Sequence, residues 1–504
     1  MIKKIQQDFS YYSHEFKDNY RKGVHRLRTI LASRAQAQAF VSNAGGVAVV
    51  LGYEPETPNK NAQELYALLA ASPYIDDAVQ TFLGSIYEAG AESQDAMYSD
   101  SARCLEILHD PVLSRAAGAG TVSAGKWIAT LAGQSCNLYR DMNAVAASDI
   151  AMTAVAASET AMAAVVSNAT ALNALVTSQV ALNAVAASET AMAAVIGNVT
   201  ALNAVVTSQL AMNAVAASET AMTAVIANTA AFNTVVTSHV AMNAVASSYV
   251  AVAAVYESAV AVEAVKANET AWSTLTGASS AVMGKAAAKL VGLNPADYAD
   301  MDAIAASSTA MAAIASSSTA MAAVASSQTA MAAIEKSQVA KDAIAASDMA
   351  TAKYAVGAAG LKPADYANMA AVAASQTAMA AIASSQTAMA AIASSSTAMA
   401  AIASSSIALN TIAASTTALD AIYAKKKRMS GASASLSGKF IILQISNDNA
   451  FDTSQYGYAT LSDGSKPKWD SYKGKYAYFK QYKKIATYMK NDTDRDDWID
   501  YFQC

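Results

Sequence analysis

Residues 151–180 read A-M-T-A-V-A-A-S-E-T, A-M-A-A-V-V-S-N-A-T, A-L-N-A-L-V-T-S-Q-V, which is one ten-residue unit written three times. The unit recurs with few changes through residue 276. Its second position is large and apolar, its fifth is Val or Leu, and its eighth is Ser or Asn. An internal repeat of this kind predicts a solenoid, in which each unit buries its apolar face against neighbouring units.

The residue types of the unit favour helix. Alanine dominates, and Met, Leu, Glu and Gln are also good helix formers. Apolar residues at positions two, five and six share one face of a helix. Ser or Asn at position eight is suited to the N-cap, where the side-chain oxygen accepts a backbone N–H of the first turn. Glu159, Glu189 and Glu219 then fall in the first turn, where the helix dipole favours an anion.

A single continuous helix fits the spacing less well. In a continuous helix, ten residues at about 100° each would rotate the apolar stripe by roughly 80° from one unit to the next. Two such helices could keep their stripes in contact only in a supercoil much tighter than that of ordinary coiled coils. We therefore expect short helices, each ending at a Ser or Asn. Because short helices are not stable alone, they must stack.

A longer period of thirty residues indicates how they stack. S-E-T recurs from Ser158, Ser188 and Ser218, and unlike decads that begin with Asn or with S-Q or S-H lie between these copies. One interpretation is a three-sided coil with one helix per side. The other is a recent duplication of a thirty-residue unit without geometric meaning. The later repeats do not show this period clearly.

The chain divides by composition into eight segments, and the predicted fold is mainly α with a small α+β end. We expect these segments: 1–140, a helical N-terminal docking domain; 141–276, the first repeat array; 277–300, a break; 301–350, the second array; 351–368, a break; 369–424, the third array; 425–437, a basic and Ser/Gly-rich linker; 438–504, a small separate α+β domain.

Local patterns add detail to both ends. Residues 61–72 and 101–109 are expected helices, whereas Gly45-Gly46 and residues 116–125 are expected turns or linkers. Residues 439–446 and 475–479 resemble strands, and Asp463-Gly464 is a hairpin turn pattern. Residues 482–490 or 497–502 are candidates for helix.

Composition excludes several classes of protein. A net charge of −5 over 504 residues argues against nucleic-acid binding. Mean hydropathy is +0.22, but polar residues interrupt the array every few positions, so no transmembrane segment is expected. The start lacks the apolar stretch of a signal peptide. We therefore expect synthesis in a cytoplasm, without membrane insertion.

Residues with catalytic potential are sparse. Cys104 with His109 suggests a thiol site only weakly, and His239 stands where Gln179 and Gln209 stand in the other copies, so we interpret it as a surface substitution. We expect no enzyme activity and no cofactor. The methionine column is expected in the core.

Two patterns near the C-terminus are candidate sites. Aromatic residues interleaved with lysines suit a sugar or a protein interface, although most of these rings could equally form the core of a small domain. The binding candidates are Trp469, Tyr472, Tyr476, Tyr478 and Tyr482. The acids Asp492, Asp494 and Asp496 resemble the start of a calcium loop, but residues 497 and 503 do not fit one, so we expect no metal and a solvated turn.

The repeats also carry a family resemblance. Decads such as T-A-M-A-A-I-A-S-S-S, from Thr309, and the L-x-P-A-D-Y-A-[DN]-M breaks, from Leu293 and Leu361, resemble the repeat regions of tail-fibre and related virion fibre proteins of large tailed bacteriophages. The resemblance covers 141–424. It implies an N-terminal part that docks to other virion proteins, a repeat spacer, and a C-terminal tip that contacts the host surface or another fibre. A homo-oligomer is possible in such fibres, although a solenoid in each chain does not require one.

Two other functions stay open. The Ser/Thr rows of the array could bind a glycan or ice, which would make the chain a repeat adhesin. An enzyme acting on a surface polysaccharide through the C-terminal domain is supported only by the aromatic content there. Deletion of whole decads separates a spacer from such an adhesin. A spacer would become shorter and still attach, whereas an adhesin that binds along its Ser/Thr rows would lose affinity with each deleted decad.

Overall fold

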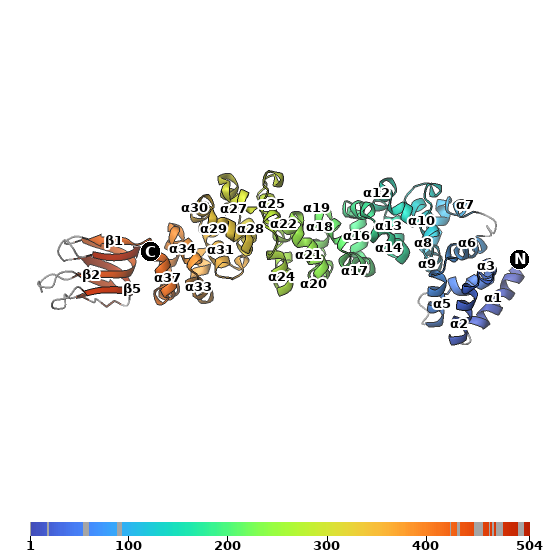
Figure 1. Ribbon diagram of the computed structural model, residues 1–504, viewed down its shortest axis with the longest axis horizontal. Coiled ribbons are helices and arrows are strands. Elements are labelled where there is room, and N and C mark those ends of the chain that lie inside the picture. Colours follow the sequence, from blue (N-terminus) through green and yellow to red (C-terminus); the bar gives the residue numbers. More distant parts are fainter. Residues whose placement is uncertain are drawn as a thin grey trace. The chain divides into compact units, whose positions relative to one another are not determined.

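The computed structural model describes residues 2–17, 20–53, 60–87, 93–423, 425–430, 434–447, 457–462, 464–465, 468–469, 477–491 and 498–503. The chain divides into two compact units, residues 1–254 and 255–504. Its elements are labelled in Figure 1.

The first unit begins with a helical bundle. Its helices are α1 Ile2–Lys17, α2 Tyr20–Ala32, α3 Arg34–Val41, α4 Ala44–Leu51, α5 Lys60–Ala70, α6 Ile75–Ile86, α7 Gln94–Tyr98, α8 Ser101–His109, α9 Pro111–Ala117 and α10 Thr121–Leu131. The helices expected over 61–72 and 101–109 are α5 and α8. Gly45 and Gly46 lie inside α4, not in a turn, because Asn43 caps that helix with its Oδ1, which accepts the N–H of Gly46 at 2.7 Å. A Cβ at Gly46 would lie about 3.0 Å from the rings of Phe40 and Tyr12, so glycine lets these rings approach the helix.

The repeat array follows a short 3-10 helix, η1 Cys136–Leu138. Its helices are α11 Met142–Ala146, α12 Asp149–Ala157, α13 Glu159–Val166, α14 Ala169–Thr177, α15 Gln179–Ala186, α16 Glu189–Gly197, α17 Val199–Thr207, α18 Gln209–Ala217, α19 Glu219–Ala227, α20 Thr229–Thr237 and α21 His239–Ser247. Thus every decad is its own two-turn helix, as the slip of the apolar stripe predicts. Bends of 97° to 104° separate α12 from α13, α14 from α15, α16 from α17 and α18 from α19.

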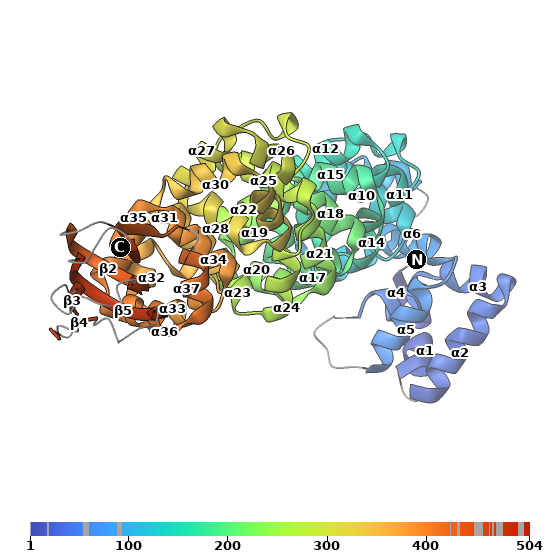
Figure 2. The ribbon, with the colours of Figure 1, turned by 60° about the vertical axis from the view of Figure 1, so that its left-hand side comes forward.

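Helices three apart in the chain stack on one another. In the first unit α12, α15, α18 and α21 form one stack, visible as a row in Figure 2, and α13, α16, α19 and α14, α17, α20 form the other two. Each coil therefore has three sides and thirty residues, which confirms the three-sided interpretation. The second and fifth positions of each decad lie inside, so Met152 and Val155 are fully buried.

The second unit contains the rest of the array. Its elements are α23 Ala259–Lys266, α24 Glu269–Thr276, α25 Ser280–Leu290, η2 Pro295–Asp297, α26 Met301–Ala306, α27 Ser308–Ser316, α28 Ser318–Ser326, α29 Gln328–Lys336, α30 Gln338–Ala345, α31 Asp348–Ala358, η3 Pro363–Asp365, α32 Met369–Ala374, α33 Gln376–Ala383, α34 Gln386–Ser394, α35 Ser396–Ser404, α36 Ser406–Ala414 and α37 Thr416–Tyr423. Helix α22, Tyr249–Glu257, crosses the boundary between the units. The three-helix period continues here in the stack α25, α28, α31, α34 and α37.

The segment 351–368 does not interrupt the solenoid, contrary to the expectation of a break, because the eleven-residue helix α31, which begins at Asp348, packs on both α28 and α34. In the segment 277–300, the eleven-residue helix α25 packs on α28. A turn then follows at Gly292 or Gly360, whose positive φ angles of 72° and 75° favour glycine. The extra residues lengthen one side of a coil without ending the stack.

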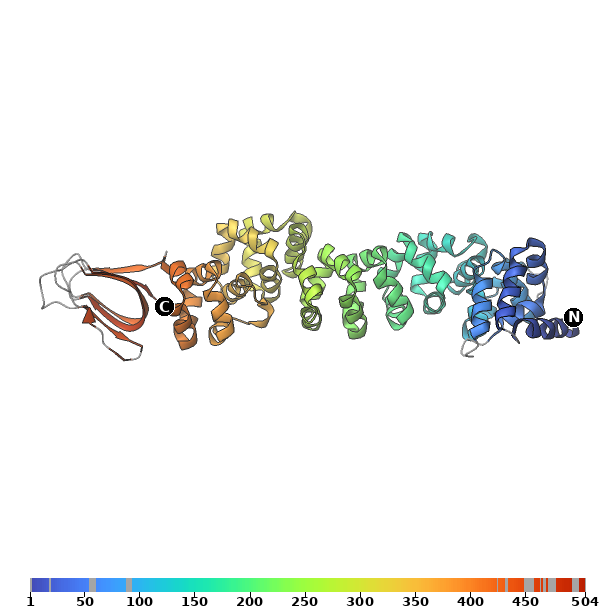
Figure 3. The ribbon, with the colours of Figure 1, turned by 60° about the horizontal axis from the view of Figure 1, so that its bottom comes forward.

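The C-terminal segment forms a six-stranded antiparallel sheet, curved in Figure 3. Its strands are β1 Lys427–Ser430, β2 Ala434–Asn447, β3 Gly457–Leu461, β4 Lys468–Trp469, β5 Ala477–Asn491 and β6 Trp498–Gln503, in the order β1-β6-β2-β5-β3-β4. The strand expected over 439–446 lies in β2, and β3 and β4 pair as the hairpin around Gly464, whose φ is 80°.

Three expectations for this segment are wrong. Residues 482–490 belong to β5, and 498–502 belong to β6, so the helices considered there are strands. The basic residues 427–430 are not linker but strand β1, because they pair with β6. The sheet has a hydrophobic cluster of its own, which includes Phe440, Met489 and Ile499. Ile441 and Phe502 instead join the core formed by α32 to α37.

Candidate functional site

The eighth position of the decad carries the polar contacts that connect successive coils. At Ser188 the hydroxyl oxygen accepts the N–H of Ala191 at 3.2 Å and donates to the carbonyl of Ala156 at 2.6 Å, thirty-two residues earlier. Thus a residue predicted only as a cap also joins two coils. The same donation, over the same thirty-two residues, is made by Ser178, Ser218, Ser238, Ser248, Ser337, Ser405 and Ser415.

This geometry bears on the Ser/Thr rows considered as a binding surface. The cap serines are mostly half-buried, and their hydroxyls are engaged in these bonds. Some threonines two residues later do the same, as Thr160 and Thr170 donate to the carbonyls of Leu131 and Ala119. These bonded hydroxyls therefore stabilise the stack, whereas others in the rows, such as Thr200 and Ser308, are exposed.

A second polar arrangement lies at the eleven-residue helices. The buried ammonium of Lys353, in α31, donates to the carbonyls of Pro363 at 3.1 Å and Tyr366 at 3.2 Å, which closes the turn around η3. Lys126, in α10, does the same for Cys136 and Tyr139. The two segments share the same spacing of four residues: a lysine, a glycine seven positions later, a tyrosine thirteen positions later and a cap residue fifteen positions later. Residues 121–142 are therefore a copy of the segment that contains the Pro-Ala-Asp-Tyr motif.

We call this segment the elbow module, and the chain has three: residues 121–142, 280–301 and 348–369. Lys285 occupies the lysine position of the second module. Sequence reasoning missed the first module because C-N-L-Y replaces P-A-D-Y there. The shared lysine seven residues before the glycine, and the tyrosine thirteen residues after the lysine, could have revealed it.

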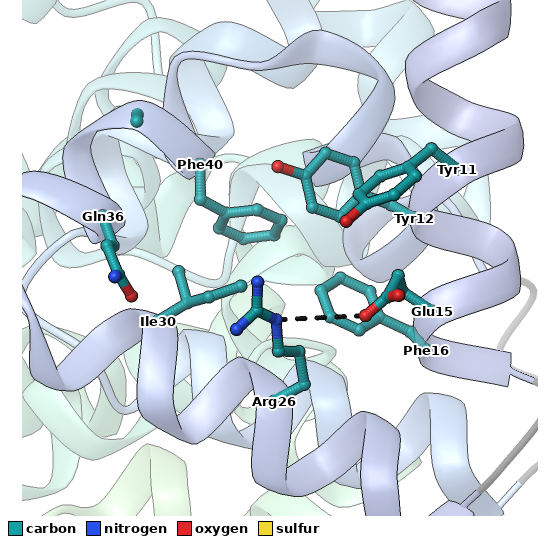
Figure 4. Close-up of a pocket in the computed structure, with 9 residues that line it drawn as sticks. Tyr11, Tyr12, Glu15, Phe16, Arg26, Ile30, Gln36 and Phe40 are labelled. Carbon is teal, nitrogen blue, oxygen red and sulfur yellow. Dashed lines mark ion pairs between the residues drawn. The ribbon is translucent and has the colours of Figure 1, made fainter.

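A cavity of about 240 Å³ lies in the N-terminal bundle, between α1, α2 and α3 (Figure 4). Rings of Tyr12, Phe16 and Phe40 pack against one another on its wall, with centroids 5.4 to 5.9 Å apart. Arg26 lies 3.9 Å from Glu15 at its edge, and both side chains are partly exposed. Burial raises the pKa of Tyr12. The cation at the edge of this aromatic hollow, Arg26, is thus already paired with Glu15.

The C-terminal candidates lie largely outside the described residues. Trp469 is in β4, opposite Gly457, and Tyr478 is in β5, opposite Ser446. Tyr482 also lies in β5. Tyr472, Tyr476 and the acids Asp492, Asp494 and Asp496 fall outside the part of the chain that the structure describes. These candidates therefore stay predictions.

The sheet does hold one charged cluster that the sequence did not single out. The carboxylate of Asp500, in β6, is fully buried and accepts two bonds from Arg428, from Nε at 2.6 Å and from Nη2 at 2.9 Å. Lys426 lies 3.2 Å from the same carboxylate. The Asp500 carboxylate raises the pKa of Arg428. The basic run expected as a linker instead attaches β1 to the sheet.

The weak thiol candidate gains no support. Cys104 is buried, and burial raises its pKa to about 12, so its reactive thiolate is disfavoured at neutral pH. His109 Nδ1 lies 2.8 Å from the carbonyl of Leu105 in its own helix. His239 is exposed and bonds to Asn243, as Gln179 bonds to Asn183, which agrees with a surface substitution.

Among the described residues, no group of three or more His, Cys, Asp or Glu side chains could hold a metal ion. No single helix among them has both the length and the apolar composition to cross a membrane; seven bent pairs of consecutive helices meet these criteria only when combined.

Comparison of the sequence with models of protein families found no match, and comparison with curated proteins found no relative. The fold therefore defines the class, an α-solenoid of decapeptide helices with a β-sheet at its C-terminal end.

Proposed function

We propose that this chain is a structural component of a bacteriophage virion, a tail or collar fibre whose repeat region is a spacer. Its N-terminal bundle docks to other virion proteins. Its C-terminal end carries a terminal module for host attachment or fibre assembly. The chain acts without catalysis or a cofactor.

The observation that carries this proposal is the bonding between coils. Cap serines donate to a carbonyl one coil earlier in both units, at Ser188 and at Ser405 for example. Stacked repeats of this kind are stabilised by the interface between each repeat and the next, so an array can be lengthened or shortened by whole coils. That property suits a part whose role is to set a distance.

The structure offers a clean deletion to test the spacer. Removal of residues 189–218 joins Ser188 to Glu219 and recreates the S-E-T sequence of the native junction. Because one whole coil is lost, the shortened chain should fold and be shorter by about 8–10 Å in solution scattering. Removal of residues 189–208, two helices instead of three, is the matched control and should destabilise the array by placing unlike sides on one another.

The function itself is tested on virus particles. Purified particles of the phage that encodes the chain should contain it, and particles carrying the 189–218 deletion should still adsorb to the host. Particles that lack the protein would refute the virion assignment. A loss of adsorption that grows with each deleted coil, in a chain that remains folded, would instead favour the adhesin.

A further inference from the structure

Two of the three stacks do not continue across the second elbow module. Beyond this module α26 stacks on α29 and α27 stacks on α30. Within the range 259–345, all of which the structure describes, α23 does not stack on α26 and α24 does not stack on α27. Figures 1 and 2 both show α24 and α27 on opposite edges of the ribbon. Of the helices α23 to α25, α25 is therefore the one that stacks onward, on α28.

The second position of the decad in α24 reflects this interruption. In the array this position is buried in the core, as at Met212 and Met242. In α24 it is occupied by Trp272, which is only half-buried. The ammonium of Lys362, from the third elbow module, lies over the Trp272 ring, 5.6 Å from its centroid. A cation thus covers a ring that no stacked helix covers.

The turn around η3 also reaches back to the end of α23. Lys362 Nζ donates to the carbonyl of Lys266, ninety-six residues earlier, at 2.9 Å. The Lys266 ammonium in turn pairs with Asp365 of the same turn, and with Glu263 at 2.8 Å. The Lys266 side chain is only 9% exposed. Burial by itself lowers the pKa of Lys266, yet the two carboxylates raise that pKa above its ordinary value. We call the contacts of Lys362 and Asp365 with Lys266 and Trp272 the ionic latch.

The second elbow module lacks bonds that close the other two. Lys126 and Lys353 each donate to two carbonyls of their own turn. Lys285 has the same place in the second module, but within residues 280–301, all of which are described, it donates to neither carbonyl of its turn. The module at which two stacks end is therefore also the one that its lysine does not close.

We propose that the second elbow module is a hinge within the second unit, and that the ionic latch holds this hinge closed. Elsewhere in the array, bending would separate the apolar interfaces between stacked helices. At this module, bending breaks mainly the polar contacts of the latch, because α23 and α24 have no stacked helix to lose there. A hinge of this kind is confined to a few residues between rigid elements.

The chemistry of the latch sets what should open it. Ion pairs and cation–π contacts at a partly exposed site weaken as salt screens the charges, and Asp365 is 45% exposed. We therefore expect the stiffness of the second unit to fall with rising ionic strength. This inference does not depend on the virion assignment, since it concerns only residues within 255–504.

The test is the distance between two spin labels on either side of the hinge, measured in the full chain by pulsed electron paramagnetic resonance. The labels are attached at Ser273→Cys on α24 and Ala380→Cys on α33, two exposed positions, in a Cys504→Ser background. Cys104 and Cys136 are buried and should stay unlabelled. At low salt the wild-type latch should give one narrow distribution of distances, and about 1 M salt should broaden it.

The double substitution Lys362→Met, Asp365→Asn should raise the open population at least roughly tenfold at low salt, because charge-assisted bonds to Lys266 are lost. Asp297→Asn is the matched control. Asp297 has the place of Asp365 in the second module and accepts a bond from Asn294 of its own turn at 3.1 Å, so this variant should behave as the wild type does.

A second pair of labels, at Ala380→Cys and Ala400→Cys, lies on one side of the hinge in the third array. Its distribution should stay narrow in every variant, which shows that the array remains folded. A double variant with an unchanged distribution across the hinge would overturn the proposal. So would a wild type that is already broad at low salt, or equal broadening of both label pairs.

Discussion

The hydroxyl of Ser188 bonds in two directions, to the N–H of Ala191 in its own helix and to the carbonyl of Ala156 in the preceding coil. The first bond starts a helix, and the second attaches that helix to the stack. A short alanine-rich helix is unstable by itself, so it needs both the cap and the contact with the preceding coil. One small side chain supplies both bonds. Local capping and long-range stacking are thus coupled at every such serine.

Replacing Ser188 with alanine should therefore cost more than the loss of a cap alone. We expect the free energy of unfolding to fall by about 1–3 kcal/mol, from a lost cap and a lost bond to a half-buried carbonyl. Ser167→Ala is the control, since that exposed hydroxyl bonds only within its own helix, and it should change stability by under about 0.5 kcal/mol. Urea denaturation of both variants measures the difference; equal values would contradict the double role.

Gly118 makes room for the cap of α14. A Cβ at Gly118 would lie 1.2 Å from Nδ2 of Asn168, whose Oδ1 accepts the N–H of Ala171 at 3.0 Å. Gly118→Ala should displace this buried amide and destabilise the first unit by about 1–2 kcal/mol. Gly197→Ala, where nothing lies within 4 Å of the added carbon, should be neutral or slightly stabilising.

A double-mutant cycle tests the cause. Asn168→Ser shortens the cap residue to the type used at Ser158, so it should recover most of the stability lost by Gly118→Ala. If thermal denaturation shows that the stability changes of Gly118→Ala and Asn168→Ser simply add in the double variant, Gly118 acts through some other contact.

Lys353 is expected to stabilise the third elbow module in a pH-dependent way. Lys353→Met keeps the length of the side chain but leaves two carbonyls without their donor, so the second unit should lose about 1–3 kcal/mol. Burial lowers the pKa of Lys353, whereas the unfolded lysine titrates near about 10.4. Between these two values the unfolded chain binds more protons, so the stability of the wild type relative to the variant should rise with pH.

Urea denaturation of both proteins from neutral pH to about pH 10 measures this slope. Lys336→Met, at an exposed position in α29, is the control and should show neither the loss nor the slope. A wild-type advantage that shrinks with rising pH would contradict the lowered pKa.

Asp500 should hold strand β1 in place. Asp500→Asn removes the negative charge that pairs with Arg428 and Lys426. We expect the free energy of unfolding to fall by about 1–3 kcal/mol. The loss should be smaller than for a fully buried ion pair, because both cations are partly exposed. Trypsin should then cleave after the basic residues of β1 sooner than in the wild type. Lys425→Gln, an exposed neighbour, should leave cleavage of β1 unchanged, and equal rates in all three proteins would show that the pair does not secure the strand.

Much of the fold follows from local patterns in the chain. The Ser and Asn caps, the buried second and fifth positions and the break at each decad are all visible in residues 151–180, because capping and helix amphipathicity act within a few residues. The turn at Gly464 was visible for the same reason. The first elbow module was missed because its defining contact, from Lys126 to Tyr139, spans a turn whose sequence has changed.

The C-terminal segment shows the opposite case. Residues 482–490 contain lysine, alanine and methionine, which tolerate helix, yet they form β5 because β2 and β3 supply hydrogen bonds on both sides. Likewise, Lys426 and Arg428 look like solvated linker residues until Asp500, more than seventy positions away, is placed beside them. Neither outcome has a local cause.

The amino-acid sequence by itself determined that the array is a series of short capped helices, one to each decad, because capping and amphipathicity depend on residues close together in the chain. The tertiary structure alone decided that three helices make one coil, which carbonyl each cap serine bonds, and that Asp500 pairs with Arg428. Those contacts depend on groups about thirty to seventy residues apart. Only the stacking of coils and the pairing of strands brings such groups within hydrogen-bonding distance.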